Sequence, residues 1–330
     1  MMTNNTMSNN VGEHKDYRYS AQSENFGILP TDIEMGEAAG VAVGNSDLVY
    51  VYNRGKYPII VFDTEGKFKS AWGEGTSINP HGVTVGPDND IYCVDAGDHT
   101  LKKFDAEGNL KLTIGTPGKS SGRMSGLPFC HPTHAAVSSK TGNIFVSDGY
   151  SNAVVHKFDP NGRLISSWGR SGTDPGEFNT VHNIAIDEDE WVYIADRENH
   201  RIQVFDSNGK FETQWGNLAM AACIFIQSAP EKTFFIGEFF AGIMENPGGL
   251  GNWTGQRLGP RISVLDKNGR IIARIGEQPI GLAAGEFVAP HGISLDSKGN
   301  IYVGEVSWSA YGNNFDPPQK VRTIQKLNKI

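Results

Sequence analysis

Three histidines recur at equivalent places in the chain and have the residue type needed to bind a metal ion together. His81 follows Pro80, and His182 and His291 likewise stand just before a short alternating apolar run. Such runs are typical of β-strands. Three imidazoles around an open coordination position form the ligand set of a catalytic zinc site, in which the metal polarises a bound oxygen or lowers its pKa. The recurrence therefore predicts a zinc site at His81, His182 and His291, provided that the fold brings them together.

Side chains suited to bind and deprotonate a substrate follow the second apolar run of several repeats. Arg54, Tyr150 and Arg197 all stand at such places. An arginine near a metal can bind a substrate carboxylate through two parallel hydrogen bonds. A tyrosine can accept a proton when a nearby cation lowers its pKa. We expect these three side chains to face the histidines.

The remaining histidines have simpler interpretations. Any single histidine can merely fill a turn, so the metal prediction depends on all three repeats together. His134 is offset by one residue from the repeated position, aligns with Gly82, and is expected to point elsewhere. His99, His156 and His200 are expected at the surface or at strand edges.

The elements that carry these residues form a unit of four predicted strands. Turns of the Phe-Asp-x-x-Gly type, or Leu-Asp-x-x-Gly in the fifth unit, join the third and fourth strands, and glycine supplies the positive φ that such turns require. The six units begin near Gly40, Pro80, Pro132, Val181, Ala222 and Pro290. Four-stranded units in radial repetition indicate an all-β fold, a six-bladed β-propeller. The Trp-Gly pairs that end several units are expected to pack between blades.

A propeller explains why the histidines would meet. The first strand of each blade lines the central channel, and alternate blades of six are about 120° apart. The histidines belong to blades 2, 4 and 6, so their side chains are predicted to converge on the axis. The equivalent positions of blades 1, 3 and 5 are Ala39, Thr133 and Ala222. The carboxylates that end the second strands are expected to make structural hydrogen bonds; they are Asp95, Asp148, Asp196, Glu238 and Glu305.

Length and composition set the domain organisation and the partner class. Residues 1–24 are rich in Asn, Ser and Thr and predict a flexible tail, and residues 25–330 predict one propeller domain whose last blade is completed by a strand near 27–29. The formal charge of −8 argues against nucleic acid and anionic membranes, which need a basic face. A small-molecule substrate is expected, and monomer and homo-oligomer remain open.

The compartment is predicted from two absences. The sequence has no apolar run of the roughly 20 residues needed to cross a bilayer, and its first residues contain no apolar segment of a signal peptide. These features predict a cytoplasmic protein. Its three cysteines, Cys93, Cys130 and Cys223, are odd in number and far apart, which predicts buried free thiols.

Particular segments resemble known families. Residues 194–205 resemble the NHL repeat of propeller proteins. Residues 129–133, 146–152, 195–199 and 289–291 are similar to segments of the peptidyl-α-hydroxyglycine α-amidating lyase family. Members of that family are six-bladed lyases that cleave an N-acyl-α-hydroxyglycine to an amide and glyoxylate. The resemblance implies zinc at the three histidines, Arg54 as the carboxylate-binding arginine and Tyr150 as the general base.

The chain also departs from that family. Ala289 stands where the family has a methionine in the substrate pocket. Val41 and Val83 match two positions whose carbonyls bind calcium in the family, but Gly292 stands where the family has the aspartate ligand. Insertions at 240–260 and 308–318 follow second strands and are expected to overhang the metal face.

Three functions from different classes fit the sequence. The first is a zinc-dependent lyase acting on a carbinolamide or related α-hydroxy acid, with zinc replaceable by another divalent transition metal. The second is a metal-dependent hydrolase of the propeller lactonase type, whose sites usually use acidic ligands. The third is a non-catalytic NHL-type scaffold that binds a partner, which should tolerate loss of His182.

Overall fold

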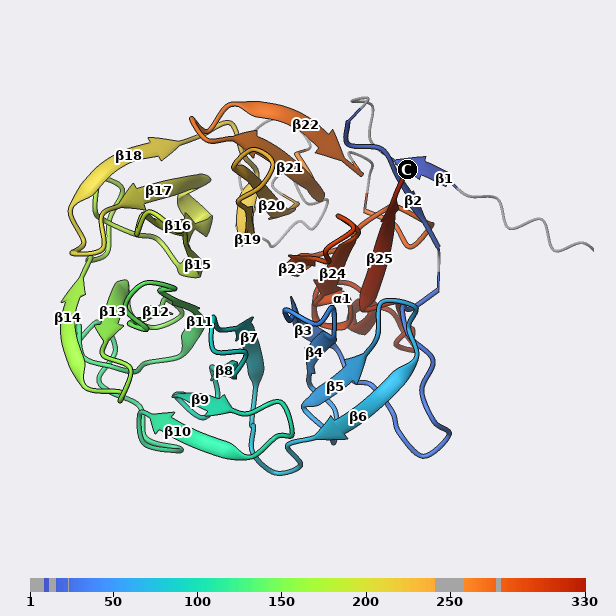
Figure 1. The fold of residues 1–330 in the computed structure, drawn as a ribbon, viewed down its shortest axis with the longest axis horizontal. Helices are drawn as coiled ribbons and strands as arrows, with labels where there is room; N and C mark the ends of the chain where they lie inside the picture. Colours follow the sequence, from blue (N-terminus) through green and yellow to red (C-terminus); the bar gives the residue numbers. More distant parts are fainter. Residues whose placement is uncertain (1–8, 12–15, 23, 241–257, 277–279) are drawn as a thin grey trace, which may run out of the picture.

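The structure is a computed structural model of the 330-residue chain, and it describes residues 9–11, 16–22, 24–240, 258–276 and 280–330. Six antiparallel sheets surround a central axis (Figure 1). The first strand of each sheet lies innermost, so the channel is lined by six equivalent strands. The predicted all-β, six-bladed propeller with four strands per blade is confirmed, and one blade carries a fifth strand in addition.

Blades 1 to 5 each contain four consecutive strands. Blade 1 holds β3 (Ala38–Val43), β4 (Val49–Asn53), β5 (Ile59–Phe62) and β6 (Phe68–Trp72), and blade 2 holds β7 (Pro80–Val85), β8 (Ile91–Asp95), β9 (Thr100–Phe104) and β10 (Leu110–Ile114). Blade 3 holds β11 (Pro132–Val137), β12 (Ile144–Asp148), β13 (Val154–Phe158) and β14 (Leu164–Trp168). Blade 4 holds β15 (Val181–Ile186), β16 (Val192–Asp196), β17 (Arg201–Phe205) and β18 (Phe211–Trp215), and blade 5 holds β19 (Met220–Gln227), β20 (Thr233–Phe239), β21 (Arg261–Asp266) and β22 (Ile271–Ile275).

Blade 6 closes the ring with strands from both ends of the chain. Its order is β23 (Pro290–Leu295), β24 (Ile301–Glu305), β25 (Ile324–Lys329), β2 (Tyr19–Ala21) and β1 (Asn9–Val11). The prediction for this strand was wrong: the closing strand is β2, and residues 27–29 make only an isolated bridge between Ile28 and Lys67. The Tyr19 side chain is 1% exposed, and its burial anchors a segment that was predicted to belong to the flexible tail.

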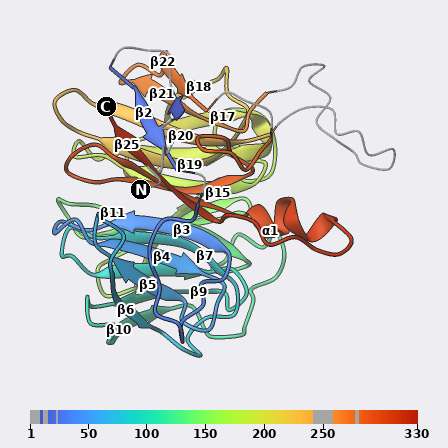
Figure 2. The same ribbon diagram turned by 90° about the vertical axis from the view of Figure 1, so that its right-hand side faces the viewer.

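The few helices lie between strands on one face. The short helix α1 (Ser307–Ala310) and the 3-10 turn η2 (Gly312–Asn314) follow β24, and η1 (Arg197–Asn199) follows β16. In Figure 2, α1 stands out beyond the sheets on that face. Among the described residues, no helix is long and apolar enough to span a membrane.

Neighbouring blades are joined by tryptophan packing against turn glycines, as predicted for the Trp-Gly pairs. A side chain at Gly108 would collide with the ring of Trp72 in the preceding blade, and Gly209 stands in the same relation to Trp168. Gly108 has φ +89°, so only glycine satisfies both the turn and the close approach. The three cysteines are buried and free, which confirms that prediction.

The acidic residues that end second strands hold the first strands in place, as predicted. In the blades that carry the three histidines, each such carboxylate accepts hydrogen bonds from backbone N–H groups just before the first strand. The pairs are Asp95 with Asn79, Asp196 with Asn179, and Glu305 with Ala289. Each bond therefore fixes the backbone two or three residues before a histidine.

Candidate metal centre

The structure brings the three predicted ligand histidines together at the end of the channel. Each lies at the start of the first strand of its blade, on β7, β15 and β23. All three are buried, and their ligand nitrogens lie within 4.8 Å of one another. The imidazole centroids are 4.4 to 5.0 Å apart. Nitrogens bound to one zinc ion at about 2.0–2.1 Å lie at most about 4.2 Å apart. Small movements of the imidazoles toward one another would let the three nitrogens share one ion.

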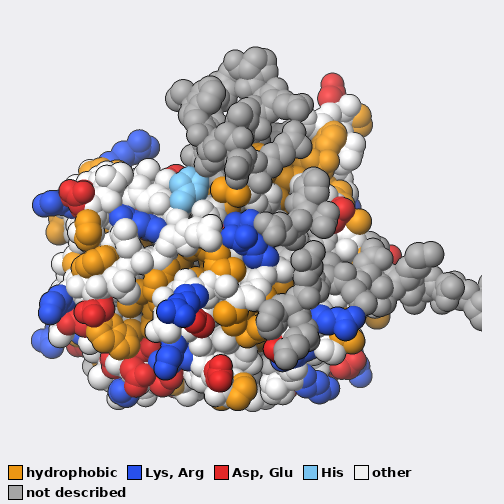
Figure 3. Space-filling view, turned by 90° about the horizontal axis from the view of Figure 1, so that it is seen from above, with side chains coloured by type: hydrophobic (Ala, Val, Ile, Leu, Met, Phe, Trp, Pro, Cys, Tyr) orange, Lys and Arg blue, Asp and Glu red, His pale blue; other side chains and the backbone are white. Residues whose placement is uncertain are grey.

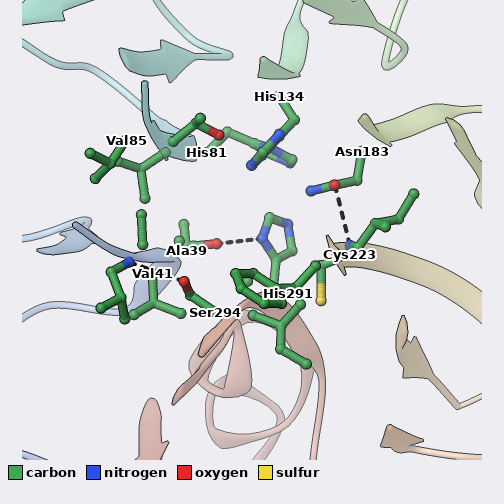
Figure 4. Close-up of a pocket in the computed structure, with 18 residues that line it drawn as sticks. Ala39, Val41, His81, Val85, His134, Asn183, Cys223, His291 and Ser294 are labelled. Atoms are coloured by element: carbon green, nitrogen blue, oxygen red, sulfur yellow. Dashed lines mark hydrogen bonds between the residues drawn. The ribbon is translucent and has the colours of Figure 1, made fainter. Parts of the chain in front are cut away.

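A matching hydrogen bond orients each of the three imidazoles. The Nδ1 atom of His81 lies 2.6 Å from the carbonyl of Thr133, and that of His182 lies 2.7 Å from the carbonyl of Ala222. His291 is bonded to the carbonyl of Ala39 at 2.6 Å, as Figure 4 shows. A carbonyl only accepts, so Nδ1 carries the proton and Nε2 keeps its lone pair. Each ring therefore presents Nε2 to its neighbours.

The three imidazoles are neutral at pH 7. Burial is the main cause that lowers the pKa of each ring, and for His291 it brings the pKa to about 3. The positive charges of Arg54 and Arg197 act in the same direction on His81 and His291. A neutral imidazole is the form that binds a metal. The cluster is thus ready to accept a cation without first releasing protons.

Tyr150 lies directly over the cluster. It follows β12, and its hydroxyl is 2.8 Å from Nε2 of His81 and 3.0 Å from Nε2 of His182. The residue is 41% exposed, although its hydroxyl contacts two buried histidines. Burial raises the pKa of the Tyr150 hydroxyl, and the charges of Arg197 and Arg54 oppose that rise. Of the predicted residues, this one is placed nearest to the histidines.

Arg54 reaches the cluster from the side of blade 1. Its Nε donates to the carbonyl of Pro80, the residue before His81, at 3.3 Å. Its Nη1 lies 2.6 Å from the carboxylate of Glu37. These contacts occupy Nε and Nη1 and leave Nη2 for a ligand. The predicted pair of hydrogen bonds from Arg54 to a substrate carboxylate would therefore have to come from the two N–H groups of Nη2.

Arg197 approaches from the opposite side, between two aromatic rings. Its guanidinium carbon is 5.6 Å from the centroid of Tyr150 and 5.5 Å from that of Phe239, while Nη2 bonds Glu198 at 2.6 Å. Phe239 ends β20, and its ring centroid lies 6.1 Å from that of His182. Phe239 could not be predicted from the sequence, because no local pattern distinguishes it from the buried phenylalanines of the same strand.

The channel continues below the cluster as a cavity of about 130 Å³ (Figure 4). Val41, Val83 and His134 line it, and no carboxylate of the described residues does. A side chain at Gly292 would meet the backbone of Val41 at 2.8 Å, so the position has no room for an acidic ligand. Calcium requires several oxygen ligands, usually with carboxylates among them, so these residues do not fit it. His134 lies in this layer and is separate from the three-histidine group.

Other predicted positions lie farther from the cluster. Ala289 is 2% exposed and packs in an apolar group with Ala39, Val288 and Val306; its place in a substrate pocket stays a prediction. The surface or edge assignment of two histidines was wrong: His156 is fully buried between Asp148 and Ser167, and His99 is 8% exposed. His200 is half-buried at the end of η1.

The predicted insertions span residues 240–260 and 308–318. Residues 241–257 of the first lie outside the described residues. The second begins within α1, whose Ser309 hydroxyl is 3.2 Å from Nη1 of Arg54. This segment therefore reaches the face that carries the cluster, as predicted.

On the side of the molecule in Figure 3, acidic and basic side chains are interspersed.

The fold and the site together define a β-propeller with a three-histidine centre on its axis. A family model described as a six-bladed β-propeller matches residues 135–241, and an NHL repeat model matches residues 78–104. The human NHL repeat-containing protein 3 is 30% identical over 275 residues, which cover 78% of this chain and 73% of that protein. The chain belongs to the NHL-repeat family of six-bladed β-propellers.

Two further relatives have names that refer to peptide amidation. Peptidyl-glycine α-amidating monooxygenase B of Xenopus laevis is 29% identical over 60% of this chain and 22% of its own length. Peptidyl-α-hydroxyglycine α-amidating lyase 1 of Drosophila melanogaster is 30% identical over 56% of this chain and 34% of its own length. The chain thus matches only about a fifth to a third of these relatives.

A solved structure shares the architecture. The gluconolactonase of Xanthomonas campestris superposes with a TM-score of 0.60 at 11% identity, covering 98% of this chain and 96% of that one. At this identity the likeness shows the propeller fold alone.

Proposed function

We propose that this protein is a zinc-dependent lyase that cleaves the C–N bond of an N-acyl-α-hydroxyglycine, or of a related α-hydroxy acid, to give an amide and glyoxylate. The observation that carries the proposal is the buried cluster of three neutral imidazoles, each with Nε2 available, under the Tyr150 hydroxyl. The relative named peptidyl-α-hydroxyglycine α-amidating lyase 1 supports the same reaction class.

The residues present fit a zinc ion. Three imidazoles with fixed tautomers leave one position of a tetrahedral site open, as catalytic zinc requires. Other divalent transition metals also bind imidazole, so the choice of zinc as the native metal is itself proposed. A bound divalent ion would supply Lewis acidity toward the substrate oxygens.

The chain's own residues account for the proton and the substrate orientation. Arg54 binds the substrate carboxylate through Nη2 and so fixes the α-carbon near Tyr150. Burial raises the pKa of the Tyr150 hydroxyl, so its ionised form would require a cation held by the histidines beside it. In that form the Tyr150 oxygen takes the proton of the α-hydroxyl group. The O–H electron pair then forms the aldehyde carbonyl of glyoxylate while the C–N bond breaks. The leaving nitrogen accepts that same proton from Tyr150, and the amide is released.

The direct test is turnover of a simple substrate by zinc-loaded protein. With N-acetyl-α-hydroxyglycine we expect glyoxylate and acetamide in equal amounts, above the rate of spontaneous breakdown. A rate no faster than that in buffer, in protein that holds one zinc per chain, would reject the lyase assignment and leave the metal site standing.

A metal-dependent lactone hydrolase is the second candidate, because three ligands and an open position also suit activation of water. Among the described residues, however, the candidate ligand group contains no carboxylate. A panel of small lactones separates the two, since a lyase of the proposed type leaves them intact.

A further inference from the structure

Glu37 connects three distant parts of the chain beside Arg54. Its carboxylate is buried, with Oε1 accepting from the backbone N–H of Ser309 at 2.7 Å. Its Oε2 accepts from the Ser309 hydroxyl at 2.7 Å and from Nη1 of Arg54 at 2.6 Å. The backbone N–H of Arg54 also donates to the Glu37 carbonyl at 2.9 Å. One residue thus links the start of blade 1, the loop after β4 and the helix α1.

We propose that Glu37 is a positioning residue that fixes the Arg54 guanidinium and binds α1 to it, so that Arg54 selects ligands with a free carboxylate. The inference rests on the proposed function for the role of Arg54. Glu37 itself touches neither the histidines nor the open side of the cluster in any contact that the structure records.

The hydrogen bonds require an ionised glutamate. Two oxygens accept from three donors, one of them a guanidinium, and a carboxylate has acceptor sites for all of them. A glutamine would offer a single acceptor oxygen and would turn its own N–H groups toward donors. The substitution Glu37→Gln therefore keeps the size of the side chain and removes one or two of its three side-chain hydrogen bonds.

Packing alone does not hold Arg54. A cavity of about 470 Å³ lies beside it, with Met35, Trp308 and Val321 in its wall together with Glu37 and Arg54. The Arg54 side chain is 26% exposed, and its bond to the Pro80 carbonyl is long at 3.3 Å. Without Glu37 the guanidinium has space to turn into this cavity. The short bond to Glu37 is therefore what keeps Nη2 directed to one place.

The selection follows from the arrangement of donors. Acceptors among the described residues occupy Nε and Nη1, and within this part of the chain only Nη2 remains to meet a ligand. A carboxylate gains a charge-assisted hydrogen bond there, whereas a carboxamide of the same shape gains a weaker one and brings its own N–H groups. A displaced Nη2 should therefore weaken the binding of carboxylate ligands more than the binding of carboxamide ligands.

The experiment compares binding of N-acetylglycine and N-acetylglycinamide to zinc-loaded protein by calorimetry. We expect the unmodified protein to prefer the acid. We expect Glu37→Gln to weaken binding of the acid roughly tenfold, the scale of one charged hydrogen bond, and to leave the amide unchanged. Glu37→Asp, which keeps the charge on a shorter arm, should recover part of the preference. Glu177→Gln is the matched control, because it makes the same change in the Arg170–Glu177 pair of a blade 3 loop.

Several results would overturn the proposal. These are equal preference for the two ligands in the unmodified protein, unchanged acid binding in Glu37→Gln, or an equal loss for acid and amide, which indicates a general structural effect. Because neither ligand reacts, failure of the lyase assay does not affect this measurement. Hydrogen exchange gives a separate readout: the Ser309 amide should exchange faster in Glu37→Gln than in Glu177→Gln.

Discussion

Blades 2, 4 and 6 differ from blades 1, 3 and 5 at one position of the first strand, and this difference creates the site. The first set places an imidazole on the axis. The second set has Ala39, Thr133 and Ala222, whose backbone carbonyls accept the Nδ1 protons of the histidines. Every side chain of the second set is fully buried. A three-histidine centre therefore arises in a ring of six because alternate blades supply imidazoles and the carbonyls that orient them.

The two sets should respond differently to substitution. The histidine blades contribute side-chain atoms, so replacing the side chain removes the function. The intervening blades contribute backbone atoms, which most substitutions leave in place. The experiments below test this contrast at positions where the two kinds of contribution can be separated.

Removal of a histidine should have the largest effect. His182→Ala leaves two imidazoles, and we expect zinc affinity to fall on the order of 1000-fold, since a total binding free energy of about 10–16 kcal/mol is shared among a few ligands. Elemental analysis after dialysis against a weak chelator measures the loss. His134→Ala is the control, because this histidine lines the channel below the cluster. If the two variants retain the same amount of zinc, the three-histidine assignment is wrong.

Replacement of Tyr150 should separate chemistry from metal binding. Tyr150→Phe keeps the ring over the cluster and removes the hydroxyl that contacts His81 and His182. We expect kcat for the α-hydroxyglycine substrate to fall about 100- to 10,000-fold, the usual contribution of a general base, with zinc content unchanged. Tyr57→Phe, in the loop between β4 and β5, is the control. An unchanged kcat would remove Tyr150 from the reaction.

Acid should destabilise the metal-free protein through its buried histidines. Burial lowers the pKa of His134 to about 4 and that of His291 to about 3, below the value near 6.5 of an unfolded chain. Between these values the unfolded state binds more protons, so the free energy of unfolding falls as the pH decreases below about 6.5. Each group contributes up to about 1.4 kcal/mol per pH unit.

Urea denaturation at pH 7, 6 and 5 measures this slope. His134→Asn should reduce it by the share of one group, because that side chain no longer titrates. An equal slope in the variant and the unmodified protein would mean that unfolding causes no proton uptake by His134.

The sequence was most informative where a feature repeats. The Phe-Asp-x-x-Gly turns and the three histidines recur in register, so the blades and the candidate ligands could be read without a structure. The closing strand β2 has no turn marker and pairs with β25 from the other end of the chain, so it was misplaced. Glu37 contacts Ser309 across 272 positions, and no local pattern indicates such a pair. His156 was assigned to an edge because burial of a polar ring depends on its partners in neighbouring strands.

The smallest effect should come from the intervening blades. Ala222→Gly removes a buried methyl group but keeps the carbonyl that orients His182. We expect a loss of stability of about 1–2 kcal/mol from the methyl group and the added backbone freedom. Zinc affinity should change by less than the 10- to 100-fold typical of losing an orienting partner. Zinc titration and urea denaturation of the same sample measure both quantities. A fall in zinc affinity as large as 100-fold would show that the side chain of the intervening blade, and not its backbone alone, determines where the carbonyl lies, and the distinction between the two sets of blades would fail at this position.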